Sequence, residues 1–169
     1  MKKIIFIAFV LLSLGFVNAQ NFYVGGSVGI ETFSEGIDDV AFPLTLHVGA
    51  ENLGIDNLGV RADGSFLLNT SEGNVDFTVI QLGLNGIYNF SELIPDQPID
   101  FYVGVGPRLI ISSNGDTETD VGVGAIAGAS YNVLSEVSLF GEARGDVYFG
   151  DPDTYSGLGF GVGAKYHFY

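Results

Sequence analysis

The feature of this 169-residue sequence that most restricts its fold is a period of two in the apolar residues. Apolar side chains recur at every second position in stretches of about ten residues, a pattern typical of β-strands with one apolar face. Eight such stretches can be distinguished, at residues 21–33, 43–51, 58–68, 76–90, 99–112, 121–133, 137–149 and 156–169. The pattern predicts an all-β chain with eight strands.

Each stretch has one apolar face and one face of polar residues and glycine. In the last stretch, Leu158, Phe160 and Val162 alternate with glycine at 159, 161 and 163. A soluble barrel or sandwich shows the same alternation with its apolar face inside. The period alone therefore does not distinguish water from lipid as the outer solvent.

The positions of the basic residues after residue 20 favour lipid, rather than water, as the outer solvent. Arg61, Arg108, Arg144 and Lys165 all lie mid-strand on the polar-and-glycine face, and the expected turns contain none. A soluble protein would carry cations on its turns and outer surface, and a lysine or arginine facing lipid at the bilayer midplane costs roughly 2–4 kcal/mol. Glycine on the same face suits a narrow lumen that must accommodate long charged side chains. We therefore expect a single eight-stranded, antiparallel, up-and-down transmembrane β-barrel.

The first 19 residues have the parts of a secretory signal peptide. Lys2 and Lys3 precede an apolar run that begins at Ile4, and Ala19 ends a small-residue cleavage site. The run is interrupted and shorter than the roughly 20 apolar residues of a transmembrane helix. We expect residues 1–19 to be removed during export and residues 20–169 to form the barrel domain in the bacterial outer membrane.

Aromatic residues of the apolar face gather near one expected end of the barrel. With the mature N-terminus on the periplasmic side, they would form a girdle at the periplasmic membrane interface. Its members are Phe22, Tyr88, Phe90, Phe101, Tyr131, Tyr166 and Phe168. Phe66 and Phe149 would mark the opposite interface.

With these features the chain resembles the OmpX and OmpA transmembrane-domain group of small outer-membrane barrels, over essentially the whole mature sequence. Gly163, Tyr166, Phe168 and Tyr169 are similar to the C-terminal signal that the assembly machinery of this family reads. One departure is that the alternation makes Phe168, not the final Tyr169, the last lipid-facing aromatic. The resemblance implies a monomer in outer-membrane lipid, with the barrel-assembly machinery and periplasmic chaperones as partners during biogenesis.

The inward face carries enough ionisable residues to predict an ion-pair network. Hairpin register suggests that Glu51 lies near Arg61 and that Glu142 lies near Lys165. Because eight strands enclose an interior that side chains nearly fill, we expect the network to plug the lumen. Its expected members are Glu51, Arg61, Asp63, Arg108, Glu142, Arg144, Asp146 and Lys165.

Three functional hypotheses follow from these features. The leading one is an integral outer-membrane protein with a structural or surface-interaction role and a plugged lumen. A narrow pore for ions or small solutes is the first alternative, and a soluble lipocalin-like ligand-binding barrel, which needs an apolar interior, is the second. The histidines, His47 and His167, have no expected Ser or Asp partner at an outer loop, so we expect no enzyme, no catalytic residue and no cofactor.

The charge balance restricts the possible partners further. Loss of Lys2 and Lys3 leaves four basic residues against 20 acidic ones, a net charge of −16. Such a surface repels phosphates and argues against nucleic acid. The acidic residues of the expected outer loops favour a solvated rim, with weak divalent-cation binding as the alternative and no defined metal site. They are Glu35, Asp38, Asp39, Glu72, Asp116, Glu118, Asp120, Asp151 and Asp153.

Overall fold

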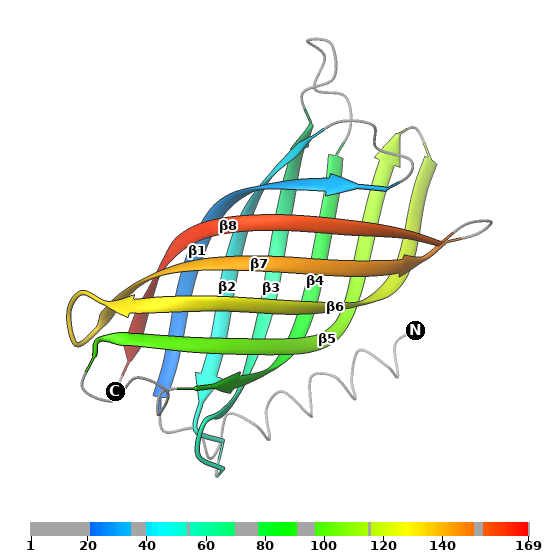
Figure 1. Ribbon diagram of the computed structural model, residues 1–169. Helices are drawn as coiled ribbons and strands as arrows, with labels where there is room; N and C mark the ends of the chain where they lie inside the picture. The colour runs from blue at the N-terminus through cyan, green and yellow to red at the C-terminus, as the bar shows by residue number, and fades with distance from the viewer. Residues whose placement is uncertain are drawn as a thin grey trace.

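A computed structural model describes residues 21–34, 40–53, 55–69, 78–90, 97–114, 116–150 and 154–168. These residues form the strands β1 (Asn21–Phe33), β2 (Ala41–Glu51), β3 (Leu58–Asn69), β4 (Thr78–Asn89), β5 (Ile99–Asn114), β6 (Asp116–Asn132), β7 (Val137–Phe149) and β8 (Thr154–Phe168). Every strand pairs antiparallel with its chain neighbours, and β1 also pairs with β8, so the sheet closes into a barrel (Figure 1). The expected fold class is confirmed. The expected signal peptide at residues 1–19 lies outside the described residues.

The start of β6 departs most from the sequence-based expectation. This strand begins at Asp116, five residues before the expected start at 121, and its pairing with β5 continues to Asn114 opposite Asp116. Thr117 and Thr119 are β-branched residues that favour extended backbone, which accounts for the longer hairpin. The expectation that Asp116, Glu118 and Asp120 belong to an outer loop was therefore wrong.

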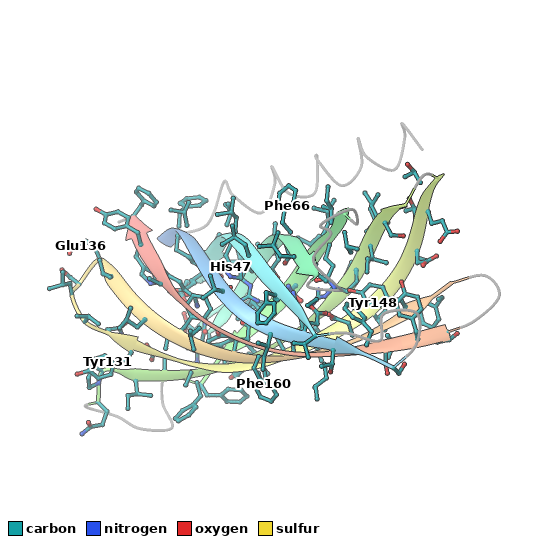
Figure 2. The ribbon with its side chains drawn as sticks, turned by 90° about the horizontal axis from the view of Figure 1, so that it is seen from above. His47, Phe66, Tyr131, Glu136, Tyr148 and Phe160 are labelled. Carbon is teal, nitrogen blue, oxygen red and sulfur yellow. The ribbon has the colours of Figure 1, made fainter. Side chains whose placement is uncertain are left out.

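The two faces of the sheet meet different surroundings. Val28, Leu46 and Phe160 are 59%, 69% and 57% exposed, whereas the neighbouring inward residues Tyr23 and His47 are each 3% exposed. Figure 2 shows Phe66 and Phe160 projecting away from the barrel, with His47 inside it. An apolar outer wall around a polar interior is the reverse of a lipocalin. The soluble lipocalin-like alternative was therefore wrong.

The barrel has two unlike ends (Figure 1). At the terminal end, Phe22 of β1 lies opposite Phe168 of β8, and β2 connects to β3, β4 to β5 and β6 to β7. The remaining four connections lie at the far end. The turn from β2 to β3 contains Asn52 and Asn57 with φ of 56° and 67°, a left-handed backbone that asparagine tolerates better than most residues.

The inward residues of β7 show how the interior is layered from the terminal end to the far end. Ser138 comes first, and Phe140, Glu142, Arg144, Asp146 and Tyr148 follow at successive levels. Successive inward residues of one strand are about 6.6 Å apart. From the terminal end to the far end, these levels are therefore polar, aromatic, three times ionic and again aromatic.

Candidate functional site

The middle of the lumen contains a cluster of ion pairs built around Arg61. The guanidinium donates to both carboxylate oxygens of Glu142, at 2.6 and 2.9 Å, and its Nε lies 2.8 Å from Asp63 Oδ1. Asn85 Nδ2 donates to Asp63 at 2.6 Å, and the Tyr102 hydroxyl donates to Glu142 at 2.9 Å. Bidentate, charge-assisted bonds of this kind are among the strongest polar contacts in proteins. We call Arg61, Asp63, Asn85, Tyr102 and Glu142, together with His47, the central cluster.

His47 extends the central cluster towards β1. Its Nδ1 lies 2.7 Å from Asp63 Oδ1, and its Nε2 lies 2.9 Å from Ser27 Oγ. This order of serine, histidine and aspartate is the hydrogen-bond order of a serine hydrolase triad. The space beside Ser27 and His47 has a volume of only about 20 Å³, which is enough for about one water molecule. The geometry therefore leaves no room for an ester substrate.

A second ionic layer, the far cluster, lies beyond the central cluster towards the far end. Arg108 Nε donates to Asp146 Oδ1 at 2.8 Å, and Arg144 Nε lies 3.3 Å from Asp146 Oδ2. Arg144 Nη2 also donates to Glu31 at 2.8 Å, and Gln81 holds the other oxygen of Glu31 at 2.9 Å. The far cluster thus ties β1, β4, β5 and β7 together through five side chains.

An apolar layer lies beyond the far cluster. Tyr148 is fully buried, and its ring stacks on that of Tyr155 with centroids 5.2 Å apart. Sequence reasoning missed this layer, although apolar residues at inward positions were its visible signal. The buried members are Ala41, Leu67, Val79, Ile110 and Tyr148, with Phe33 and Tyr155 packed against them.

Lys165 lies between the central cluster and the terminal end and is held differently from the arginines. Its Nζ sits 5.0, 4.5 and 5.1 Å from the ring centroids of Tyr23, Tyr102 and Phe140. The side chain is 6% exposed and forms no ion pair with a carboxylate among the residues that the structure describes. Cation–π attraction in this aromatic cage partly replaces the missing counter-ion.

A polar cavity opens from Lys165 towards the terminal end. It has a volume of about 210 Å³, and we call it the vestibule. Ser138 Oγ joins two of its lining residues, with Asn132 Oδ1 at 2.7 Å and His167 Nε2 at 2.9 Å. The lining residues are Glu51, Asn52, Asn57, Asn89, Asp100, Ser130, Asn132, Ser138, Lys165 and His167.

The structure therefore brings most of the expected network together, but in different pairs. Arg61 lies opposite Gly49 rather than Glu51, and Glu142 lies opposite Gly161 rather than Lys165. The expected pairs of Glu51 with Arg61 and of Glu142 with Lys165 were wrong: the observed ion pair joins Arg61 to Glu142 across the lumen. Register specifies only adjacent strands, whereas these long side chains reach across the barrel.

The expected aromatic group lies at the terminal end. Phe22 pairs with Phe168, the rings of Tyr166 and Phe168 are 4.9 Å apart, and those of Tyr88 and Phe90 are also 4.9 Å apart. Phe101 and Tyr131 are also placed at this end, on β5 and β6. Of the expected assembly signal, Gly163, Tyr166 and Phe168 lie on β8, and Tyr169 lies outside the described residues.

Only part of the expected acidic rim falls within the described residues. Asp120 accepts a hydrogen bond of 3.0 Å from the Tyr155 hydroxyl, and Glu118 is exposed near the tip of the β5–β6 hairpin. Among the residues that the structure places, no group of three or more His, Cys, Asp or Glu side chains is arranged to hold a metal ion. The remaining rim positions, Glu35, Asp38, Asp39, Glu72, Asp151 and Asp153, lie outside that part of the chain.

The apolar wall, the closed antiparallel sheet and the ionic lumen define a transmembrane β-barrel. Residues 4–168 match the family model described as "Outer membrane protein beta-barrel domain". The chain belongs to this family, and its location is the bacterial outer membrane. A comparison with curated protein sequences gave no significant match.

Solved structures of other small outer-membrane barrels share the fold. Neisserial surface protein A superposes with a TM-score of 0.73 at 21% identity, covering 86% of this chain and 96% of that one. A major outer membrane protein from Thermus thermophilus gives 0.64 at 19% identity, with coverages of 88% and 98%. Ail, the attachment invasion locus protein of Yersinia pestis, gives 0.54 at 14% identity, with coverages of 88% and 97%. These low identities show a common fold.

Proposed function

We propose that this protein is a monomeric outer-membrane barrel with a structural or surface-interaction role, whose lumen is closed by its ion-pair clusters. The observation that carries the proposal is the stacking of the central cluster, the far cluster and the apolar layer across one narrow barrel. Arg61, Arg108 and Asp146 are 2%, 4% and 2% exposed. A water-filled path would leave such side chains in contact with solvent.

Charge balance supports a plug. Among the described residues, the two ionic clusters and the Lys165 cage hold four cations, Arg61, Arg108, Arg144 and Lys165, and an equal number of carboxylates, Glu31, Asp63, Glu142 and Asp146. With these charges equal in number, this part of the lumen has no net charge to attract a permeating ion. Breaking such a pair leaves an uncompensated buried charge, so each contact resists opening.

A non-enzymatic role agrees with the space around Ser27, His47 and Asp63. Their hydrogen bonds orient a histidine against an acid, but the adjoining volume of about 20 Å³ accommodates no substrate. We assign these residues a structural task, the satisfaction of buried polar groups in the lumen.

We also propose that residues 1–19 are a cleaved signal peptide, that residues 20–169 form the mature barrel and that the terminal end faces the periplasm. The ring of exposed aromatic residues at that end suits a membrane interface. Periplasmic chaperones and the barrel-assembly machinery are the biogenesis partners that this topology requires. The far end would then face outward, and the names "surface protein" and "attachment invasion locus" of two structural neighbours favour a role at the cell surface.

Planar-bilayer recordings on purified protein test the plug. We expect no reproducible unitary conductance from the wild-type protein, because three filled layers separate the vestibule from the far end. Glu118→Gln, which changes an exposed residue on β6, is the matched control and should be equally silent. Reproducible wild-type conductance that grows with Arg144→Ala would instead establish the narrow-pore alternative.

Surface proteolysis on intact cells tests the topology. A protease site inserted at position 115, between β5 and β6, should be cut if the far end faces outward. The same site inserted after Ser135, between β6 and β7, should be protected until the outer membrane is permeabilised. The opposite pattern of cleavage would contradict the proposed orientation.

A further inference from the structure

Lys165 is the buried cation whose charge the barrel leaves least compensated. The three arginines each lie within 2.8 Å of a carboxylate oxygen, whereas the Lys165 ammonium contacts aromatic faces at 4.5–5.1 Å. Taking an ammonium out of water without an anion is costly. The Lys165 ammonium can therefore still form an ion pair with an anionic partner.

The vestibule gives such a partner access to the lysine. Lys165 lines this cavity of about 210 Å³ while its side chain is otherwise enclosed by Tyr23, Tyr102 and Phe140. Pockets that bind drug-sized ligands have volumes of roughly 300–1,000 Å³, so the vestibule suits a smaller molecule. The central cluster lies behind the aromatic cage and closes the route deeper into the lumen.

The walls of the vestibule also carry charge of the opposite sign. Glu51 and Asp100 line the same cavity, and so do the amide residues Asn57, Asn89 and Asn132. Amide side chains both donate and accept hydrogen bonds. A single anion would meet two carboxylates here, and a single cation would meet Lys165. One small molecule carrying both charges matches the lining better than either.

We propose that the vestibule binds a small zwitterion with one carboxylate and one ammonium group, which is the chemistry of a free amino acid. The carboxylate pairs with Lys165 Nζ at the floor, and the ammonium is held by Glu51 and Asp100. This inference goes beyond the proposed structural role and does not depend on it, because the site needs only the terminal end of the lumen.

NMR titration of the protein purified from outer membranes, in detergent micelles, tests the proposal. The probes are glycine, acetate and methylammonium, which carry both charges, the anion alone and the cation alone. We expect glycine to shift amide resonances of vestibule residues, His167 and Asn132 among them, with an affinity at least about tenfold above either single-charge probe, as two charged hydrogen bonds rather than one would give. Equal binding of acetate and glycine would overturn the zwitterion assignment.

Two substitutions locate the site, and a third serves as the control. Lys165→Met keeps the packing against the three rings and should weaken glycine binding by about tenfold or more. Glu51→Gln, which lies outside the aromatic cage, should weaken glycine binding but not acetate binding, and it keeps the test decisive if Lys165→Met fails to fold. Glu118→Gln at the far end should leave glycine binding and acetate binding unchanged. Wild-type glycine affinity in Glu51→Gln and in folded Lys165→Met would overturn the proposal.

Discussion

The central cluster and the floor of the vestibule, which is Lys165 with its aromatic cage, each bury a cation in a narrow lumen. They differ in how the charge of that cation is compensated. Arg61 is neutralised by bidentate contact with Glu142 and by Asp63, whereas Lys165 is surrounded by Tyr23 and two further aromatic rings.

This difference in charge compensation suggests different roles for the two regions. A planar guanidinium with five donors satisfies several acceptors at once and fixes strands on opposite sides of the barrel. A caged ammonium is a point charge, and Lys165 also lines the vestibule. The central cluster is therefore expected to stabilise the fold, and the vestibule floor is expected to contribute little to stability.

The largest loss of stability is expected from Arg61→Met. This change leaves Glu142 and Asp63 buried without their shared cation, and removal of one partner of a buried pair costs about 3–5 kcal/mol. Equilibrium unfolding in urea, with the protein in lipid vesicles, measures the free energy of unfolding. A loss below about 1 kcal/mol, the scale of an exposed ion pair, would show that the central cluster is not a stabilising element.

A smaller loss is expected from Asp146→Asn in the far cluster. The amide keeps the shape of the side chain but removes the charge that Arg108 and Arg144 share. The amide oxygen can still accept the hydrogen bond from Arg108, and Glu31 remains as a partner of Arg144, so the expected loss is that of a hydrogen bond to a charged group, about 1.5–3 kcal/mol. The same urea titration should show a decrease of this size in the free energy of unfolding. A loss larger than that of Arg61→Met would reverse the proposed ranking of the two clusters.

Gly106→Ala tests how tightly the lumen wall is packed. A Cβ at this inward position would meet the Leu84 carbonyl and come within 3.0 Å of Asn85 Cα, and overpacking of this kind costs about 1–3 kcal/mol. Gly141→Ala is the matched control, since its Cβ would have nothing within 4 Å. The control should be neutral or should stabilise by up to about 1 kcal/mol. Equal unfolding free energies for the two variants would contradict a tightly packed lumen wall at Gly106.

The smallest effect is expected from Lys165→Met. The substitution loses cation–π attraction of about 0.5–2 kcal/mol but also removes the cost of burying an ammonium without a carboxylate. The two changes oppose each other, so the unfolding free energy should stay within about 1 kcal/mol of wild type. A loss as large as that of Arg61→Met would show that the two regions do not differ as described.

The strand pattern of the barrel could be predicted from the sequence because the period of two is a local signal. Val28, Leu46 and Phe160 alternate with inward residues, and each is exposed on the outer face as the alternation predicts. The extension of β6 to Asp116 was missed because its acidic residues were assigned to a solvated outer loop, whereas pairing with β5 continues as far as Asp116.

The lumen was predictable in its composition but not in its contacts. The inward positions of Arg61 and Glu142 followed from alternation, yet their contact joins residues on strands that are not neighbours. Shear and strand tilt decide which inward residues meet across a barrel, and neither can be deduced from one hairpin. For the same reason the cage around Lys165 left no simple signal, since its rings come from β1, β5 and β7.

A double-mutant cycle on Arg61 and Glu142 tests most directly the claim that ion pairs hold the lumen closed. Urea unfolding in lipid vesicles would be measured for wild type, Arg61→Met, Glu142→Gln and the double variant. The bidentate contact at 2.6 and 2.9 Å predicts a coupling energy of at least about 1.5 kcal/mol. A coupling energy near zero, with additive losses from the two substitutions, would contradict the account.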